Sequence, residues 1–153
     1  MTQIISRTAT GSWFPRGQTK PDDRVGVDVQ SVEEVIASWS IFKDRYLTRT
    51  FLEHEVTYAR RHPYVAARYL AGQFAAREAV LKLLEIDDPL PMWRHILVKC
   101  DESSCRVELC GPALYIAISQ GITDIVLSIS RDRHFAMAVA MPNVGVSSKE
   151  EPL

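Results

Sequence analysis

Glu78 and Lys82 are the residues of this chain whose types and spacing most directly suggest chemistry. They lie four positions apart in the stretch YLAGQFAAREAVLKLL, residues 69–84. This stretch consists almost entirely of strong helix formers, so both side chains project from one helical face. Ala71 and Phe74 share that face and predict that it packs inward. Two interpretations are open: an exposed helix-stabilising ion pair, or a carboxylate and an ammonium that share a site at the edge of the core.

Asp28 is a second carboxylate in an unusual position. It interrupts the apolar run VGVDVQ, residues 25–30, which predicts a short buried strand. Capping the next helix would be a routine role for Asp28, but Ser31 with Glu34 three residues later already forms a capping box there. Because a charge in an apolar strand needs a partner or a metal, a functional role and a structural role are equally open.

Asp132 is the third acid that stands out, in the short turn 131–133 between two strongly apolar segments. Two or three carboxylates converging beside Lys82 would suit a hard cation, most naturally Mg²⁺, with open positions for phosphate oxygens. The ammonium of Lys82 would then meet the phosphate as a point charge. This set of groups predicts phosphoryl transfer, and the alternative is a set of scattered structural acids.

The elements that would position these residues follow from hydrophobic periodicity and capping signals. We expect strands at 25–30, 95–99, 106–109, 122–130 and 134–141, and helices at 31–47, 51–61, 65–84 and 113–120. Strands and helices do not alternate regularly. The order therefore predicts an α+β fold in which the long helix packs on a mostly antiparallel sheet. Residues 24–141 would form this domain, after an irregular N-terminal extension (1–23) and before a flexible tail (142–153).

Composition narrows the class of protein. The chain has 153 residues, of which 46% are hydrophobic and 24% charged, as in a soluble globular domain. A net charge of -1 offers no general attraction to nucleic acid, and no segment approaches the ~20 apolar residues that span a bilayer. We therefore expect a cytoplasmic protein that binds neither nucleic acid nor membrane. Cys100, Cys105 and Cys110 favour reduced core thiols over a disulfide framework or a zinc site.

Several ordered motifs resemble those of the holo-acyl-carrier-protein synthases, the small phosphopantetheinyl transferases. They are VGVDV, YLAGQFAAREAVLK, VELCGPA and LSISRDRHFAMAVA, and the similarity runs from about Arg24 to Met141. The resemblance implies a phosphopantetheinyl transferase-like fold and Mg²⁺-dependent transfer of phosphopantetheine from coenzyme A to a serine of an acyl or peptidyl carrier protein. It also implies a homotrimer whose active sites lie between subunits.

The resemblance also implies roles for individual residues. Asp28 and Glu78 match the metal-binding acids of the family, and Asp132 matches a further acid at the metal or its water. Lys82 matches the lysine that contacts coenzyme A phosphate. Glu78 would act as the base for the serine hydroxyl, directly or through a metal-held water. We therefore expect Glu78, Lys82 and Asp132 to be catalytic, and Asp28, Glu78 and Asp132 to hold Mg²⁺.

The sequence also departs from the family pattern at the expected coenzyme A site. Gln73 replaces an arginine that would bind phosphate, and a neutral amide is not a conservative replacement. Arg131 replaces a histidine; it can bind phosphate but cannot exchange a proton near neutral pH. We expect Lys82, Arg131 and Gln73 to line the coenzyme A site.

Two further departures affect the surroundings of that site. The family's Gly-Thr-Gly loop after the lysine is absent, and Glu34 reverses a charge where relatives carry a carrier-docking arginine. The sequence thus predicts a transferase for a carrier protein of a specialised biosynthetic pathway. The alternatives are a repurposed member that binds or acts on a carrier protein or other ligand without transfer, and a purely structural trimer.

Overall fold

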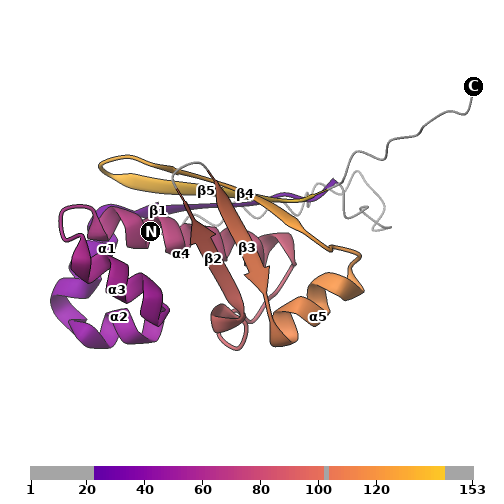
Figure 1. Ribbon diagram of the computed structural model, residues 1–153, viewed down its shortest axis with the longest axis horizontal. Helices are drawn as coiled ribbons and strands as arrows, with labels where there is room; N and C mark the ends of the chain where they lie inside the picture. Colours follow the sequence, from indigo (N-terminus) through magenta and orange to yellow (C-terminus); the bar gives the residue numbers. More distant parts are fainter. Residues whose placement is uncertain (1–22, 102–103, 144–153) are drawn as a thin grey trace, which may run out of the picture.

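A single antiparallel sheet forms the frame of the molecule, which is described here for residues 23–101 and 104–143 of a computed structural model (Figure 1). Most of the predicted N-terminal extension and tail lie outside these residues. The strands are β1 (Gly26–Ser31), β2 (Ile96–Cys100), β3 (Cys105–Leu109), β4 (Ile125–Arg131) and β5 (Phe135–Pro142). Their order across the sheet is β1-β5-β4-β3-β2, and every neighbouring pair is antiparallel.

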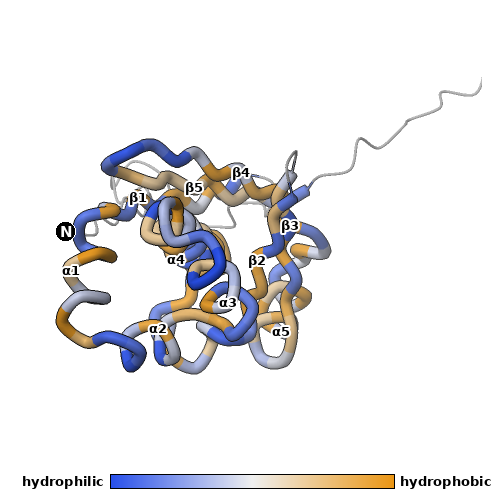
Figure 2. The backbone as a smooth tube through the Cα atoms, turned by 60° about the vertical axis from the view of Figure 1, so that its left-hand side comes forward, coloured by the Kyte–Doolittle hydropathy of each residue, from blue (hydrophilic) through white to orange (hydrophobic). Residues whose placement is uncertain are grey.

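The helices gather on one face of this sheet. They are α1 (Val32–Phe42), α2 (Asp44–Thr50), α3 (Glu53–Arg61), α4 (Ala66–Leu83) and α5 (Gly111–Ser119), with a 3₁₀ turn η2 (Trp93–His95) before β2. Figure 2 shows α4 in the middle of the molecule, with the sheet on one side and α1 to α3 and α5 around it. The predicted α+β fold is confirmed. No helix in the described part of the chain is both long and apolar enough to cross a membrane.

Small residues let α4 lie unusually close to the sheet. On β5, Ala136, Ala138 and Ala140 face the helix and are fully buried. On β1, a Cβ atom at Gly26 would lie 1.8 Å from the carbonyl oxygen of Ala79 in α4. Gly26 and the buried Asp28 are two residues apart and therefore face the same side of the strand. The Gly-x-Asp spacing thus brings the helix backbone close and directs a carboxylate toward the same helix.

The helix predicted for residues 31–47 is broken into α1 and α2 at Lys43, whose backbone has φ 50° and ψ -137°. The break turns α2 back toward the core, where Leu47 and Phe51 are buried with Val35. Hydrophobic periodicity along the sequence does not reveal such a reversal, because the buried apolar residues of both helices pack into the same core.

The two predicted helix starts have different outcomes. Ser31 caps α1, since its hydroxyl oxygen accepts a hydrogen bond from the Glu34 amide at 3.3 Å. The helix predicted for residues 51–61 begins later than expected, because Thr50 ends α2 and α3 begins at Glu53. There the carboxylate of Glu55 accepts a 2.9 Å hydrogen bond from the Leu52 amide.

The prediction for the cysteines is also wrong. Cys100 and Cys105 form a disulfide, and Cys110 is free but exposed. The strands β2 and β3 place Cys100 directly opposite Cys105, with their Cα atoms 4.0 Å apart. Such proximity depends on the pairing register of the two strands, which the spacing of cysteines along the sequence does not determine.

Candidate active site

A buried ion pair between β1 and α4 is the centre of the candidate site. The Lys82 ammonium donates hydrogen bonds to Asp28 Oδ1 at 2.7 Å and to the Val27 carbonyl oxygen at 3.0 Å. The Asp28 side chain is fully buried and that of Lys82 is 8% exposed. Lys82 therefore pairs with an acid 54 residues away, and the exposed ion pair with Glu78 that helical spacing allowed is not formed.

Glu78 lies beside this pair, half-buried, one turn before Lys82 on α4. Burial raises the pKa of the Glu78 carboxyl; the negative charge of Asp28 raises it further and Lys82 partly offsets both effects. Burial also raises the pKa of Asp28 above its ordinary value, although its hydrogen bond and charge interaction with Lys82 oppose this rise. The structure therefore brings together the two carboxylates and the ammonium that the sequence suggested as one site.

One oxygen of this cluster is left without a partner. Asp28 Oδ2 is buried and makes no hydrogen bond, although buried polar atoms are nearly always satisfied. A free carboxylate oxygen next to a second carboxylate is an all-oxygen donor set, which suits Mg²⁺. Asp28 and Glu78 thus fit a hard divalent cation, with Lys82 alongside for an anionic group.

Asp132 lies elsewhere in the subunit. Its carboxylate is exposed at the turn between β4 and β5, where Oδ1 accepts hydrogen bonds from the amides of His134 and Phe135, each at 2.7 Å. These backbone hydrogen bonds lower the pKa of Asp132. Within the described ranges no three residues of the types His, Cys, Asp and Glu are grouped so that they could hold a metal. One subunit therefore brings Asp28 and Glu78 together but leaves Asp132 apart.

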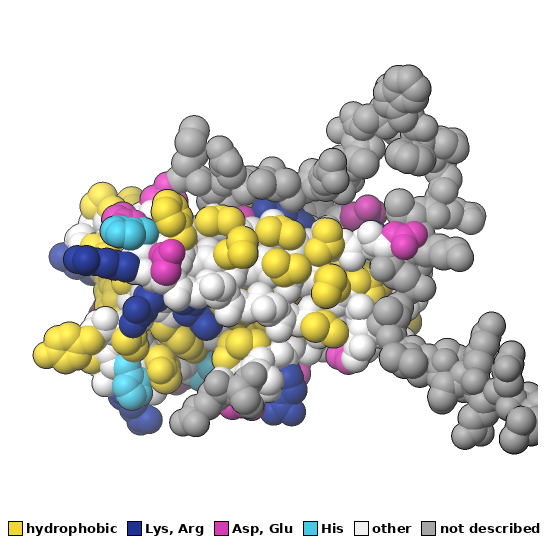
Figure 3. Space-filling model, turned by 90° about the horizontal axis from the view of Figure 1, so that it is seen from above, with side chains coloured by type: hydrophobic (Ala, Val, Ile, Leu, Met, Phe, Trp, Pro, Cys, Tyr) yellow, Lys and Arg dark blue, Asp and Glu magenta, His cyan; other side chains and the backbone are white. Residues whose placement is uncertain are grey.

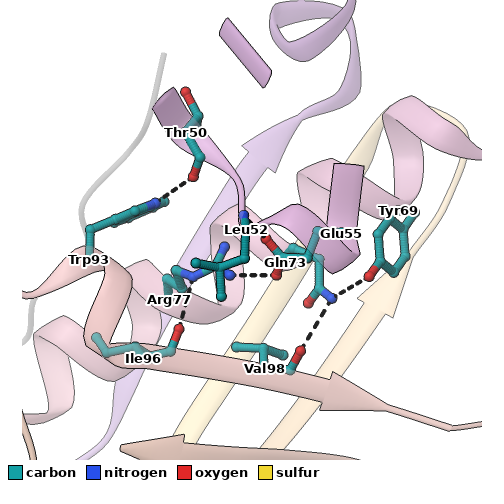
Figure 4. A network of polar contacts seen from close by, with 9 residues as sticks. All are labelled: Thr50, Leu52, Glu55, Tyr69, Gln73, Arg77, Trp93, Ile96 and Val98. Carbon is teal, nitrogen blue, oxygen red and sulfur yellow. Dashed lines mark hydrogen bonds and ion pairs between the residues drawn. The ribbon is translucent and has the colours of Figure 1, made fainter. Parts of the chain in front are cut away.

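Gln73 is inside the subunit rather than on its surface. Its side chain is 1% exposed, and its amide donates hydrogen bonds to the Tyr69 hydroxyl at 2.8 Å and to the Val98 carbonyl oxygen at 3.4 Å (Figure 4). These contacts hold Gln73 on the flank of α4 that faces β2, whereas Lys82 contacts β1 at the opposite edge of the sheet. In this position Gln73 offers little surface to a coenzyme.

Arg77 is a buried residue whose importance the sequence analysis missed. It is fully buried, forms an ion pair with Glu55, donates to the Ile96 carbonyl oxygen at 3.0 Å and lies 5.5 Å from the centre of the Trp93 ring (Figure 4). These contacts tie α4 to α3 and β2, and so fix the rotation of the helix that carries Glu78. The sequence offered one indication of this role, because Arg77 lies four residues after Gln73 and therefore on the same side of the helix.

Arg131 reaches α4 from the end of β4. It is paired across the sheet with Ala136, which is buried against the helix, and its side chain crosses α4 at Gly72. Burial lowers the pKa of Arg131, and the neighbouring Tyr69 and Tyr58 oppose this effect. Arg131 is therefore near Tyr69 and Gln73, away from the Asp28–Lys82 pair.

The combination of this fold with this site defines the class of the protein. Residues 24–140 match the family described as the 4'-phosphopantetheinyl transferase superfamily. The chain is 32% identical over 120 residues to the holo-[acyl-carrier-protein] synthase of Chlamydia trachomatis serovar L2, a match that covers 76% of this chain and 96% of that protein.

Solved structures agree with this assignment. The holo-[acyl-carrier-protein] synthase of Neisseria meningitidis has a TM-score of 0.65 at 26% identity, covering 76% of this chain and 94% of that one. The ACPS–CoA complex of Chronobacterium ammoniagenes has a TM-score of 0.62 at 25% identity, covering 76% and 93%. The chain therefore belongs to the holo-acyl-carrier-protein synthase family of phosphopantetheinyl transferases.

Proposed function

We propose that this protein transfers the phosphopantetheine arm of coenzyme A to a serine of an acyl or peptidyl carrier protein. The observation that carries the proposal is the buried Asp28–Lys82 pair with Glu78 beside it and Asp28 Oδ2 free. Family membership supports it, and one structural relative is a complex with coenzyme A. We infer that the carrier belongs to a specialised biosynthetic pathway in the cytoplasm.

Each residue of the site has its own role in this transfer. The serine Oγ attacks the phosphorus atom that bears the phosphopantetheine arm, forming a new O–P bond while the bond to adenosine 3′,5′-bisphosphate breaks. Glu78 accepts the serine proton, directly or through a water held by the metal. Lys82 neutralises charge on the diphosphate as an oriented cation. Asp28 holds Lys82 in place through its 2.7 Å contact.

We also propose that the site binds Mg²⁺. Asp28 and Glu78 would hold the ion, which supplies positive charge to the non-bridging oxygens of the diphosphate when bound. The unpartnered Asp28 Oδ2 is the oxygen that favours this assignment.

We also propose that the protein acts as a homotrimer. The outer face of the sheet exposes apolar side chains on β4 and β5, and Figure 3 shows such side chains spread across this face. Val126, Phe135, Met137 and Met141 are each 43–52% exposed. Several exposed apolar side chains on one face of a sheet favour association. In such a trimer Asp132 would take part in the site from a neighbouring subunit, because its own subunit holds it at the hairpin turn.

A basic groove beside α1 is our proposed docking surface for the carrier protein. The groove has a volume of about 710 Å³, and its basic lining residues are Lys43, Arg68 and Arg133. Its acidic residue, Glu33, is paired with His134 at 2.8 Å. The three cations favour an acidic partner, which electrostatic complementarity would steer to this side of the molecule.

The main alternative is a family member that binds a carrier protein or another ligand without transferring phosphopantetheine. The burial of Gln73 favours it, because the phosphate contact that the resemblance implies at this position is absent. The purely structural trimer is less well supported, since a relic site would not need to bury a charged pair.

The test is incubation of the purified protein with Mg²⁺, coenzyme A and a panel of apo carrier proteins, followed by mass spectrometry. We expect the mass increase of one phosphopantetheine arm, its loss in Glu78→Gln, and its retention in the exposed control Glu108→Gln. Coenzyme A binding without product across the panel would favour the alternative. Absence of both coenzyme A binding and product would overturn the transferase proposal and leave the alternative.

A further inference from the structure

We propose that Cys100 and Cys105 form a reversible thiol–disulfide switch, which controls how firmly the β2–β3 hairpin is held to the rest of the sheet. The hairpin contacts α4, the helix that carries Glu78, so the switch also sets the rate of the transfer proposed above. This second part rests on the proposed function. The switch itself depends only on the two cysteines and on the place of the hairpin in the sheet.

The β2–β3 hairpin is joined to the other strands by a short stretch of pairing. β2 lies at the edge of the sheet, and its neighbour is β3 (Figure 1). In the described part of the chain β3 pairs with β4 at two positions, whereas β4 pairs with β5 at seven. The two pairs are Cys105 with Leu127 and Arg106 with Val126. This β3–β4 joint should therefore open more readily than the other strand pairs of the sheet.

The disulfide lies at the β3–β4 joint. Cys105 is one of the two residues of β3 that pair with β4, and it packs against the buried core of the sheet and α4. On its other side Cys105 lies opposite Cys100 of β2, and the S–S bond links the two residues. The bond thus connects the edge strand β2 to the residue that holds β3 on β4. After reduction, only strand pairing and packing hold Cys105 in this position.

A small thiol can reach this bond and break it without unfolding the domain. Cys100 is exposed, whereas Cys105 is half-buried. The sequence separation of the two cysteines is five residues, so the loss of the bond costs less stability than the loss of one that closes a long loop. In the cytoplasm, where we propose that the protein acts, disulfides are usually transient and serve catalysis or redox sensing. Exposure, ring size and compartment all favour a reversible bond over a structural one.

The exchange is a two-electron reaction with a small thiol such as glutathione. A glutathione thiolate attacks the sulfur of Cys100, the more exposed of the two, so that a mixed disulfide forms and Cys105 leaves as a thiolate. A second glutathione thiolate attacks the glutathione sulfur of the mixed disulfide, which releases the Cys100 thiolate and forms glutathione disulfide. The two cysteine thiolates take up the protons that the two glutathione thiols lost. Glutathione disulfide drives the same steps in reverse.

The strand β2 transmits this change to α4. The Ile96 carbonyl oxygen, four residues before Cys100 on β2, accepts a 3.0 Å hydrogen bond from Arg77 Nε (Figure 4). Arg77 directly precedes Glu78 on α4. A hairpin that is loosely joined to β4 holds this carbonyl oxygen less firmly, so the orientation of α4 varies more. Reduction of the disulfide therefore lowers the fraction of molecules in which Glu78 is correctly placed.

Redox titration in glutathione buffers tests the switch. The full chain is incubated with glutathione and glutathione disulfide at a series of ratios, its thiols are blocked with an alkylating reagent, and its intact mass is measured. We expect the dithiol form when glutathione is in large excess, the disulfide when glutathione disulfide is in excess, and full recovery when the buffer is reversed. A disulfide that persists in a large excess of glutathione would overturn the proposal, and so would two thiols that never pair.

Brief deuterium labelling locates the structural change. At labelling times too short for global unfolding, β3 and residues 126–127 of β4 should take up deuterium in the dithiol form and be protected in the disulfide form. The strands β1 and β5 should be protected in both forms. Cys100→Ser should resemble the dithiol form in either buffer, whereas the matched control Cys110→Ser, which removes the free thiol, should respond like wild type. Equal labelling of the β3–β4 joint in both forms, or an equal loss of protection in β1, would overturn the proposal.

Kinetic measurements separate the switch from the proposed function. The disulfide form should have a kcat about threefold to tenfold higher than the dithiol form, because the base is better placed, with the KM for coenzyme A little changed. Cys100→Ser should have the lower kcat in both buffers. Equal kcat values in the two forms of an active wild type would overturn the control of transfer by the switch. If no carrier protein is modified in either form while titration and labelling give the expected results, the proposed function fails and the switch stands.

Discussion

Replacing Lys82 by glutamine would test whether the Asp28–Lys82 contact is a buried ion pair in solution. The chain contains a matched control, because Lys99 and Glu108 form an ion pair with the same N–O distance of 2.7 Å. The two pairs differ in burial: side chains are 8% and 0% exposed in the first, and 49% and 51% exposed in the second. Contact length therefore does not distinguish the two variants; they differ in burial and in the additional hydrogen bond from Lys82 to the Val27 carbonyl oxygen.

The two substitutions should lower the free energy of unfolding by clearly different amounts. Lys82→Gln leaves the Asp28 carboxylate buried without its counter-charge, which should lower the free energy of unfolding by about 3–5 kcal/mol. Lys99→Gln removes an exposed pair worth about 0–1 kcal/mol. Since a domain of this size is stable by only about 5–15 kcal/mol, the first loss is large. Urea unfolding at fixed protein concentration measures both values.

The pH dependence gives an independent check on the same variant. Burial already raises the pKa of Asp28 above 3.8, and Lys82 opposes that rise, so the pKa should be higher still in Lys82→Gln. Between 3.8 and this raised value the folded state binds the proton more readily than the unfolded state, so stability falls as pH rises through that window. The variant should therefore be closer to wild type at pH 4 than at pH 7.5.

Two results would refute this reasoning. One is a loss of unfolding free energy in Lys82→Gln that equals the loss in Lys99→Gln. This result would mean that water solvates Asp28. The other is a large cost that does not change between pH 4 and pH 7.5, which would assign the loss to packing rather than to an uncompensated carboxylate.

Three further predictions concern the helix contact, the base and the disulfide. Gly26→Ala should destabilise the fold by about 3 kcal/mol in urea unfolding, because its Cβ meets a helix carbonyl at 1.8 Å; a cost near zero would contradict the close approach. The wild-type kcat/KM should rise with pH from the acid side, since Glu78 must be ionised both to hold Mg²⁺ and to accept a proton; a flat profile would exclude it as the base. Reduction of Cys100–Cys105 should lower stability by about 2 kcal/mol, because the ring that it closes is short, whereas Cys110→Ser should change nothing; intact-mass analysis with and without reductant checks the bond itself.

Local patterns predicted much of the scaffold because its elements depend on neighbouring residues. The run of helix formers around Glu78 predicted α4, and the Ser31 cap predicted the start of α1, since both signals act within one turn of helix. The reversal at Lys43 was not predicted, because it is favoured by burial of Leu47 and Phe51 in a core assembled from distant segments.

The sequence by itself determined that Glu78 and Lys82 lie one turn apart on a long helix, and that Asp28 is a charge in an apolar strand. Only the tertiary structure decided that Lys82 pairs with Asp28 instead of Glu78, and that Gln73 is buried while Asp132 caps a turn. The physical reason is that helical spacing limits which side chains share a face, whereas their partners depend on strand register and on how closely α4 packs against the sheet.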